Sequence, residues 1–313
     1  MTTRAGVRIG IALLQLVAVS VGVFVLTTFL PGDTAEVVLG PLATVDQIDT
    51  LRAQLGLDRP VRERFLDWAG GLLHGDLGTS LATGRPVVDD MGDRLSVTVL
   101  LAVLAVVVLV PLAVALGCYG GRRPGSPADR IITATSTVAQ AVPDFALGLL
   151  LVALFALQLG WLPATAAGTV GLTGLTVAML VLPVAILVSN QLSRLARQVR
   201  IGVVETDTAE HVVHLRRLGL AERTVVLRHV LPGGVVPSVQ QFARTVDGLL
   251  GGVIVVEALF ALPGIGSGFV QAVQTRDLPV VQGYALLFAL TTVVVNLVAD
   301  LVSAKLVPQA VRL

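Results

Sequence analysis

Long apolar stretches alternate with polar segments along this chain, and six of the stretches are long enough to cross a membrane. A helix of about 20 residues spans the ~30 Å hydrocarbon core of a bilayer. The expected spans are Ile9–Leu30, Val97–Tyr119, Ile131–Leu159, Leu172–Leu192, Ser238–Glu257 and Gly283–Leu306. The third is overlong and contains Pro143, so we expect a break there and its start in the headgroup zone. The pattern predicts an all-α polytopic membrane protein with six transmembrane helices.

The polar segment Pro31–Leu95, which follows the first span, is itself patterned as helices. Thr44 is a candidate N-cap for a helix that runs on to the turn residues Leu55–Pro60. Apolar spacing then predicts a second helix over Arg62–Leu73. We therefore expect this segment to be folded rather than disordered.

A second helix-patterned segment, about Ser193–Pro237, separates the fourth and fifth spans. It is too long for an ordinary loop and carries two short helices with Gly219 between them. Gly219 is placed where a helix C-cap needs a positive φ, and Pro232 is expected to end the second helix. A rigid two-helix projection on a membrane protein indicates a docking surface.

The first helix of this projection has an apolar face and a polar remainder. Val212, Leu215 and Leu218 fall on the apolar face, whereas His214, Arg216 and Arg217 point elsewhere. The run Glu210-His211-Val212-Val213-His214 also has the residue types of a metal-binding helix, but in an order that zinc proteases do not use. No third ligand is visible, so a solvated helix face is the preferred interpretation and no metal is expected.

Composition and charge agree with a membrane protein and set its expected orientation. The chain is 54% hydrophobic and 14% charged, with a mean hydropathy of +0.85. Arg4 and Arg8 precede the first span, which places both ends in the cytoplasm when six spans follow. On this topology residues 1–30 are the cytoplasmic N-terminus and first span, 31–95 an extracytoplasmic segment, and 96–313 a five-span core. Residues 31–95 hold eleven acidic and six basic side chains, whereas arginines gather in the expected cytoplasmic loops. The first span lacks a small-residue cleavage site, so we expect it to be retained rather than removed as a signal peptide.

Enzyme chemistry finds no support in the sequence. The one lysine, Lys305, precedes Leu306, so a Gly-Lys-Ser/Thr phosphate loop cannot exist. No catalytic set, cofactor motif or nucleic-acid signature is present, and the single cysteine, Cys118, cannot form a disulfide within the chain. We expect a protein that hydrolyses no nucleotide by itself.

Charged residues inside the expected spans are functional candidates, because one unpaired charge at mid-bilayer costs at least about 2.5–3.5 kcal/mol. Asp144 follows Pro143, where it could face a pathway at the helix break or pair with an arginine at the interface. Arg244 and Asp247 are three residues apart in the fifth span. They could neutralise each other, which we prefer, or contact a transported solute. The spacing of Gly248 and Gly252 permits close helix approach.

Ordered motifs along nearly the whole length give the chain a specific resemblance. They are Pro31-Gly32-Asp33, Leu55-Gly56-Leu57-Asp58-Arg59-Pro60, Gly75-Asp76-Leu77-Gly78-Thr79-Ser80, Gly219-Leu220-Ala221-Glu222-Arg223, Pro263-Gly264-Ile265-Gly266 and Arg276-Asp277-Leu278-Pro279. The sequence resembles the first permease type of the bacterial ATP-binding-cassette importers for dipeptides, oligopeptides, nickel and related solutes. It departs from that family at Val213-His214-Leu215, at Asp144 where Ser or Thr is usual, and at Asp247 where Gly is usual.

The resemblance implies the type I importer permease fold in the bacterial cytoplasmic membrane. It also implies a second permease, two ATPase domains and an extracytoplasmic solute-binding protein as partners. The segment from Glu210 to Gly219 would be the coupling helix that contacts an ATPase; its candidate residues are Glu210, His211, His214, Leu215, Arg216, Arg217 and Gly219. The candidates for the translocation pathway are Asp144, Arg244 and Asp247. The alternative is a secondary transporter driven by an ion gradient, which would want two related halves and half-helices with central polar residues; neither is found.

Overall fold

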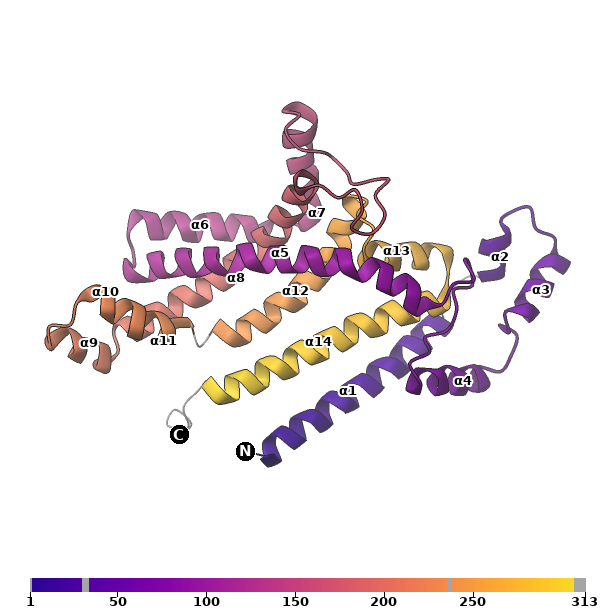
Figure 1. The fold of residues 1–313 in the computed structure, drawn as a ribbon, viewed down its shortest axis with the longest axis horizontal. Coiled ribbons are helices and arrows are strands. Elements are labelled where there is room, and N and C mark those ends of the chain that lie inside the picture. Colours follow the sequence, from indigo (N-terminus) through magenta and orange to yellow (C-terminus); the bar gives the residue numbers. More distant parts are fainter. Residues whose placement is uncertain (1, 30–33, 236–237, 307–313) are drawn as a thin grey trace. The chain divides into compact units, whose positions relative to one another are not determined.

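The computed structural model describes residues 2–29, 34–235 and 238–306, and every regular element in these ranges is a helix (Figure 1). The predicted all-α fold class is confirmed. The elements are α1 Thr2–Thr28, α2 Thr34–Leu39, α3 Val45–Gln54, α4 Val61–Leu73, α5 Val87–Arg122, α6 Pro127–Ala141, α7 Asp144–Leu151, the π-helix η1 Val152–Gln158, α8 Val177–Asp207, α9 Glu210–Arg217, α10 Glu222–Val225, the π-helix η2 Val226–Val230, α11 Leu231–Val235, α12 Ser238–Leu259, α13 Ile265–Thr275 and α14 Leu278–Leu306. The motif Pro31-Gly32-Asp33, the tail from Val307 and the side chain of Asp247 lie outside the described residues.

Four helices of the described ranges, α1, α5, α8 and α14, are long and apolar enough to cross a membrane. A fifth candidate is the bent pair of α6 with α7–η1. Helix α12, of 22 residues, occupies the fifth predicted span. The number of six spans stays a prediction.

Two predicted spans differ in shape from the structure. The break expected at Pro143 is confirmed, but it bends the third stretch by 101°, so that stretch is no continuous helix. Val142 is extended (φ −91°, ψ 121°) because a residue before proline is disfavoured in the α region. The fourth span was expected from Leu172 but begins at Val177, since Gly171 and Gly174 have positive φ and turn the chain first.

The chain forms two compact units. Unit 1 comprises Met1–Val99, Ala167–Gly174 and Ala261–Val293; unit 2 comprises Leu100–Ala166, Leu175–Phe260 and Val294–Leu313. These units reflect packing within the chain. The predicted division into 1–30, 31–95 and 96–313 reflects the side of the membrane, and it stays a prediction.

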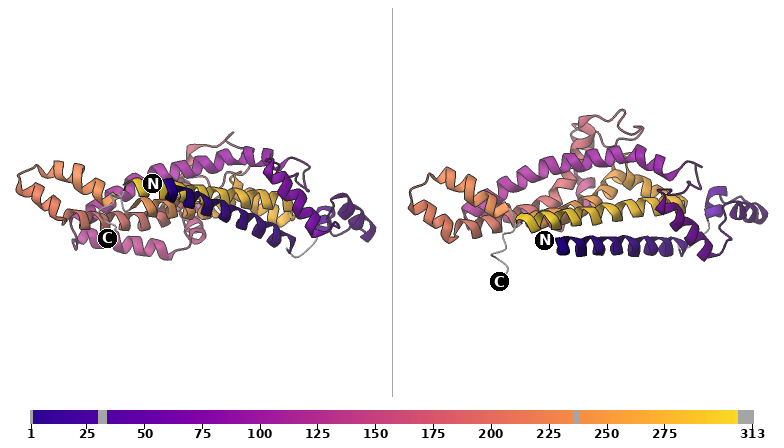
Figure 2. Two further views of the ribbon diagram at one scale, coloured as in Figure 1. Left: turned by 90° about the horizontal axis from the view of Figure 1, so that it is seen from below. Right: turned by 60° about the horizontal axis from the view of Figure 1, so that its bottom comes forward.

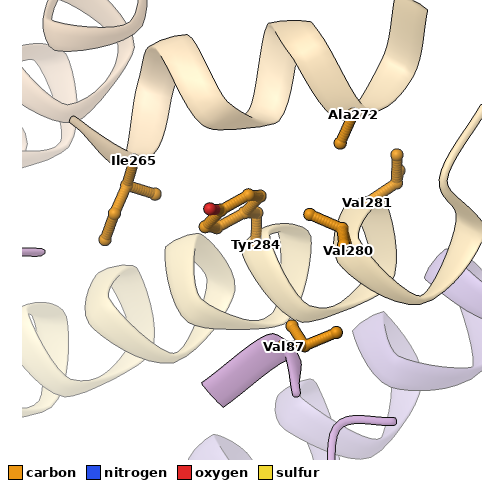
Figure 3. Close-up of a cluster of buried hydrophobic side chains, with 6 residues drawn as sticks. All are labelled: Val87, Ile265, Ala272, Val280, Val281 and Tyr284. Carbon is orange, nitrogen blue, oxygen red and sulfur yellow. The ribbon is translucent and has the colours of Figure 1, made fainter. Parts of the chain in front are cut away.

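The core of unit 1 lies where α13 packs over the start of α14. Tyr284 is fully buried among Ile265, Ala272, Val280, Val281 and Val87 (Figure 3). Its hydroxyl donates a hydrogen bond to the Asp90 carboxylate on α5. Such apolar packing, with the one buried hydroxyl satisfied, fixes α5, α13 and α14 together within this unit.

A buried carboxylate ties the turn between α13 and α14 to the loop before α5. Asp277, 3% exposed, accepts hydrogen bonds from the Ser80 hydroxyl at 2.5 Å and from the backbone N–H groups of Leu81 at 3.1 Å and Ala82 at 3.3 Å. Two motifs almost 200 residues apart in sequence are therefore partners in one anchor.

The helices predicted between the first two spans are present. Thr44 caps α3 as expected, with its side chain accepting from the Gln47 N–H and the Gln47 side chain accepting from the Thr44 N–H. Helix α4 places Phe65 and Trp68 against Phe24 of α1, with ring centroids 5.1 and 5.4 Å away.

Glycines set the helix packing of unit 2. A methyl group at Gly248 would approach Gln191 of α8 to 2.4 Å, and one at Gly252 would approach Leu187 to 3.1 Å. The expected close approach at Gly248 and Gly252 is thus confirmed, and it is made within the chain, to α8.

Candidate functional site

Helix α9 and its neighbours form the projection predicted between the fourth and fifth spans. Within unit 2, α9 and α10 lie at the end of α8 and beyond the body of that unit (Figures 1 and 2). Gly219 follows α9 with φ +78°, which confirms its predicted capping role. Its N–H donates to the Arg216 carbonyl at 3.0 Å, so the helix ends where glycine permits the turn.

The second helix of the projection does not end at Pro232, contrary to prediction. The helix passes through the π-helical turn η2 into α11, and the Leu231 N–H reaches back to the Val226 carbonyl. Proline lacks an N–H, and the wider π turn before it accommodates the missing donor. Gly233 and Gly234 follow, and a methyl group at either would clash with α8, so this stretch packs closely against α8.

An apolar inner face holds α9 on the rest of unit 2. Val212 is fully buried in a cluster with Val199, Val203, Val225 and Val230. Leu215 packs against the same cluster, so the predicted apolar face is confirmed at Val212 and Leu215. Leu218 is 62% exposed instead, because it follows the last helical residue with ψ near 0° and leaves the helical register.

Arg216 of α9 ties three elements together by its hydrogen bonds to one carboxylate on α8 and one on α10. Its Nη2 lies 2.6 Å from Asp207 Oδ1 at the end of α8, and its Nε lies 3.1 Å from Glu222 Oε2 on α10. Arg122, at the end of α5, contacts the same Glu222 at 3.1 Å. The hydrogen bond from Arg216 lowers the pKa of Glu222, and the two carboxylates raise the pKa of Arg216.

The outer face of α9 consists of Glu210, His211, His214 and Arg217, whose side chains are exposed. Glu210 lies in the first turn of α9, and His214 and Arg217 lie in the last turn, as the helix dipole favours. Of the seven residues predicted for coupling, these four face outward and Gly219 forms the cap. Leu215 and Arg216 are committed to contacts inside unit 2.

A second group of polar residues gathers among α7, α8 and α12. Asp144, the first residue of α7, accepts a hydrogen bond from Asn190 Nδ2 at 3.1 Å. Within the described part of the chain, Asn190 Oδ1, Gln191 Oε1 and Thr245 Oγ1 are buried without a hydrogen-bond partner. Buried polar atoms are rarely unpaired, so this polar cluster has unused hydrogen-bonding capacity among the described residues of unit 2.

Of the three pathway candidates, the structure brings Asp144 into this cluster. The Arg244 side chain is exposed on α12, and the side chain of Asp247 is not described. Sequence reasoning missed Asn190, Gln191 and Thr245, although polar residues inside apolar stretches were the available signal. No group of three or more metal-ligating side chains lies together in the part of the chain that the structure describes.

Comparison with known proteins assigns the chain to a family. Residues 110–312 match the model of the binding-protein-dependent transport system inner membrane component, and residues 6–102 match the model of the N-terminal region of such membrane components. The chain belongs to this family: it is a permease subunit of an ATP-binding-cassette importer, a multi-pass inner-membrane protein and no enzyme, with ATP hydrolysis carried out by separate subunits.

Individual proteins of known description match this chain along nearly the whole of its length. The chain is 34% identical over 290 residues to the glutathione transport system permease protein GsiC of Escherichia coli O6:H1, which covers 93% of this chain and 92% of that protein. The proteins of the same description from Escherichia coli K12 and Shigella dysenteriae serotype 1 show the same identity and coverage. The predicted resemblance is therefore confirmed, and nothing favours the secondary transporter.

Proposed function

We propose that this subunit carries peptides or a related small solute into the cytoplasm, and that α9 couples the membrane helices to an ATPase. The solute class follows the relatives, whose name specifies glutathione, itself a tripeptide. Nickel remains within the proposal because the family resemblance includes it. The proposed assembly contains a second permease, two ATPase domains and an extracytoplasmic solute-binding protein.

The observation that carries the coupling proposal is the division of α9 into two faces. Val212 and Leu215 hold the helix in the unit 2 core, and Arg216 fixes it by ion pairs to α8 and α10. A movement of the outer face is therefore transmitted to α8 rather than lost in a loose loop. The outer face offers both charge signs and two histidines to a partner surface.

The proposed topology places α9 and both chain ends in the cytoplasm and residues 31–95 outside. The basic residues near α9 and the acidic bias of 31–95 support it. On this topology an ATPase reaches α9 from the cytoplasm, and the solute-binding protein meets the opposite side.

The docking proposal is tested by reversing charge on the outer face. We expect Arg217→Glu combined with His214→Asp to reduce co-purification of the ATPase subunits at least tenfold, because a docked helix with reversed charges meets like charges on its partner. Arg130→Glu, an exposed arginine outside α9, is the control and should leave assembly unchanged. Full ATPase recovery with the α9 variant would contradict the docking role.

For the translocation pathway we propose that the polar cluster around Asp144 contacts the solute. Its carboxylate and the unpaired oxygens of Gln191 and Thr245 are acceptors suited to N–H groups of a peptide. Asp144→Ser, the residue type usual in the family, should assemble normally and change the relative uptake of peptides with free and acetylated amino ends. Unchanged relative uptake would remove Asp144 from the pathway.

Arg244 and Asp247 remain a proposed neutralising pair. If they pair, each single change to Ala leaves one uncompensated charge and lowers the yield of assembled complex, and the double change restores part of it. Single variants that assemble fully but transport poorly would assign both residues to the solute pathway instead.

A further inference from the structure

Unit 1 contains a cationic cavity that none of the proposed transport roles uses. Its volume is about 200 Å³, and it lies where the end of α1 meets α3, α4 and the α13–α14 turn. The residues that line it are Thr27, Thr28, Thr34, Arg52, Leu57, Arg64, Val273, Arg276, Leu278 and Val281. Three are arginines, and among the described lining residues none is acidic.

Two of the three guanidinium groups have capacity for a ligand. Arg276 Nη1 is buried and has no hydrogen-bond partner within the described part of the chain. No described ion pair engages Arg64 from α4, whereas Arg52 is held by Asp49 at 2.6 Å. A buried guanidinium N–H without an acceptor is costly, so an oxygen-rich anion in this cavity would relieve it.

The position of Arg276 is itself fixed by an unusual backbone. Arg276 is the C-cap of α13 with φ +54°, one of two non-glycine residues in the described ranges with positive φ. Its carbonyl accepts a hydrogen bond from the Thr34 hydroxyl at 2.9 Å, and Asp277 beside it is anchored to the loop before α5. The guanidinium is therefore presented from a rigid turn, which suits a binding site.

The threonines do not supply the donors for an anion. The Thr27 hydroxyl donates to the Val23 carbonyl at 2.8 Å, that of Thr28 to the Phe24 carbonyl at 2.8 Å, and that of Thr34 to Arg276. Recognition of a ligand thus rests on the arginines.

The surroundings of the cavity indicate the depth at which it lies. Leu26 and Phe29, beside Thr27 and Thr28, are 71% and 80% exposed, so the apolar surface of α1 extends to the level of the cavity. Trp68 and Phe65 of α4 pack on Phe24 of the same helix, as aromatic residues do at membrane interfaces. Phospholipid phosphates lie at the membrane–water interface, where such aromatic residues are enriched. Leu57, Leu278 and Val281 give the cavity an apolar wall for the glycerol and first acyl carbons.

We propose that this cavity binds the phosphate of an anionic phospholipid headgroup, with Arg64 and Arg276 as its ligands. The lipid would hold α4 and the α13–α14 turn at the end of α1. The inference depends neither on the transported solute nor on the direction of transport. In the proposed topology the lipid belongs to the outer leaflet.

The test is native mass spectrometry of the full chain in detergent, titrated with phosphatidylglycerol or phosphatidylcholine. The wild type should bind phosphatidylglycerol more tightly, since the choline cation is unfavourable beside arginines. Arg64→Gln with Arg276→Gln should weaken phosphatidylglycerol binding about tenfold or more. Arg62→Gln is the matched control, because Arg62 is exposed on the same helix and does not line the cavity.

Further arms distinguish other ligands and a loss of folding. Arg64→Gln alone removes one ligand without touching the α13–α14 turn, so a smaller loss is expected even if the double variant elutes as an aggregate in size exclusion. Unchanged phosphatidylglycerol binding in the Arg64→Gln variant would overturn the proposal. Displacement of the lipid by millimolar inorganic phosphate would assign the cavity to the free ion and contradict a lipid site. If the Arg64→Gln variant instead binds the solute-binding protein more weakly and still binds the lipid, the ligand of the cavity is a carboxylate of that protein, which also contradicts a lipid site.

Discussion

Arg216 and Arg217 are neighbours in sequence with different surroundings. Arg216 is partly buried between Asp207 and Glu222, whereas Arg217 lies on the outer face of α9. We expect Arg216→Gln to lower the unfolding free energy by roughly 1 kcal/mol, a value reduced for solvent screening of partly exposed pairs. Arg217→Gln should leave stability unchanged and reduce ATPase coupling. Thermal unfolding of both variants in detergent, with ATPase assays of the assembled complex, separates the two roles.

The stabilising effect of the Arg216 ion pairs should depend on pH in a definite direction. The folded-state pKa of Glu222 is lowered, so its contribution is present above the unfolded value of about 4.3 and is lost as pH falls through the folded value. The difference in stability between wild type and Arg216→Gln should therefore be largest near neutral pH and shrink below about pH 4. A difference that grows on acidification would contradict the ion-pair account.

Gly219 caps α9 with a backbone conformation that favours glycine, so its substitution tests whether coupling depends on this cap. Its φ of +78° is accessible to glycine and, at lower cost than to most residues, to asparagine. Gly219→Val should cost on the order of 1 kcal/mol or more at the cap, and should lower solute-stimulated ATP hydrolysis while membrane insertion persists. Gly219→Asn is the control and should retain most of the stimulation. If the solute stimulates ATP hydrolysis equally in the wild type and in both variants, coupling does not depend on the cap.

At the scale of elements, Asp277 makes the contact that joins the loop before α5 to the α13–α14 turn. Both carboxylate oxygens of Asp277 accept hydrogen bonds. The substitution Asp277→Asn replaces one of these oxygens by an NH₂ group, a donor that would face the Ser80 hydroxyl or a backbone N–H. We expect a loss of about 2–3 kcal/mol, because the hydrogen bonds of a buried carboxylate are removed. The unfolding midpoint in detergent should fall by several degrees. Asp89→Asn, an exposed acidic residue in the same unit, should have no such effect.

The elements that the sequence predicted well are those with local causes. Thr44 at its cap, Gly219 at positive φ and the break at Pro143 each follow from one residue and its neighbours. The size of the bend, 101°, does not follow from Pro143 alone. The helix that continues through Pro232 packs against α8, where Gly233 and Gly234 allow close contact. Local propensity does not contain that information.

The candidate site was predictable in part for the same reason. Helical periodicity alone placed Val212 and Leu215 on the inner face of α9. The ion pairs of Arg216 with Asp207 and Glu222 could not be predicted from the sequence. They join three elements, and the packing of those elements decides which arginine turns inward. The cluster of Asp144 with Asn190, Gln191 and Thr245 likewise draws on three helices.

At the scale of the whole molecule, the topology is the prediction on which the docking proposal depends. In a Cys118→Ser background, a cysteine at Asp49 should react with an impermeant thiol reagent in spheroplasts, and one at Arg217 should react only after permeabilisation. Both side chains are exposed, so access differs by side of the membrane rather than by burial. Labelling at position 217 from outside would reverse the assigned orientation.

The central claim is that this subunit moves solute when ATP is hydrolysed by partners docked on α9. The most direct measurement is uptake of a labelled peptide by proteoliposomes containing the assembled complex and its solute-binding protein. We predict uptake that requires ATP on the α9 side, persists when ionophores collapse all ion gradients, and is lost with the Arg217→Glu and His214→Asp changes combined. Uptake driven by an ion gradient without ATP, or ATP-driven uptake unchanged by those substitutions, would contradict the account.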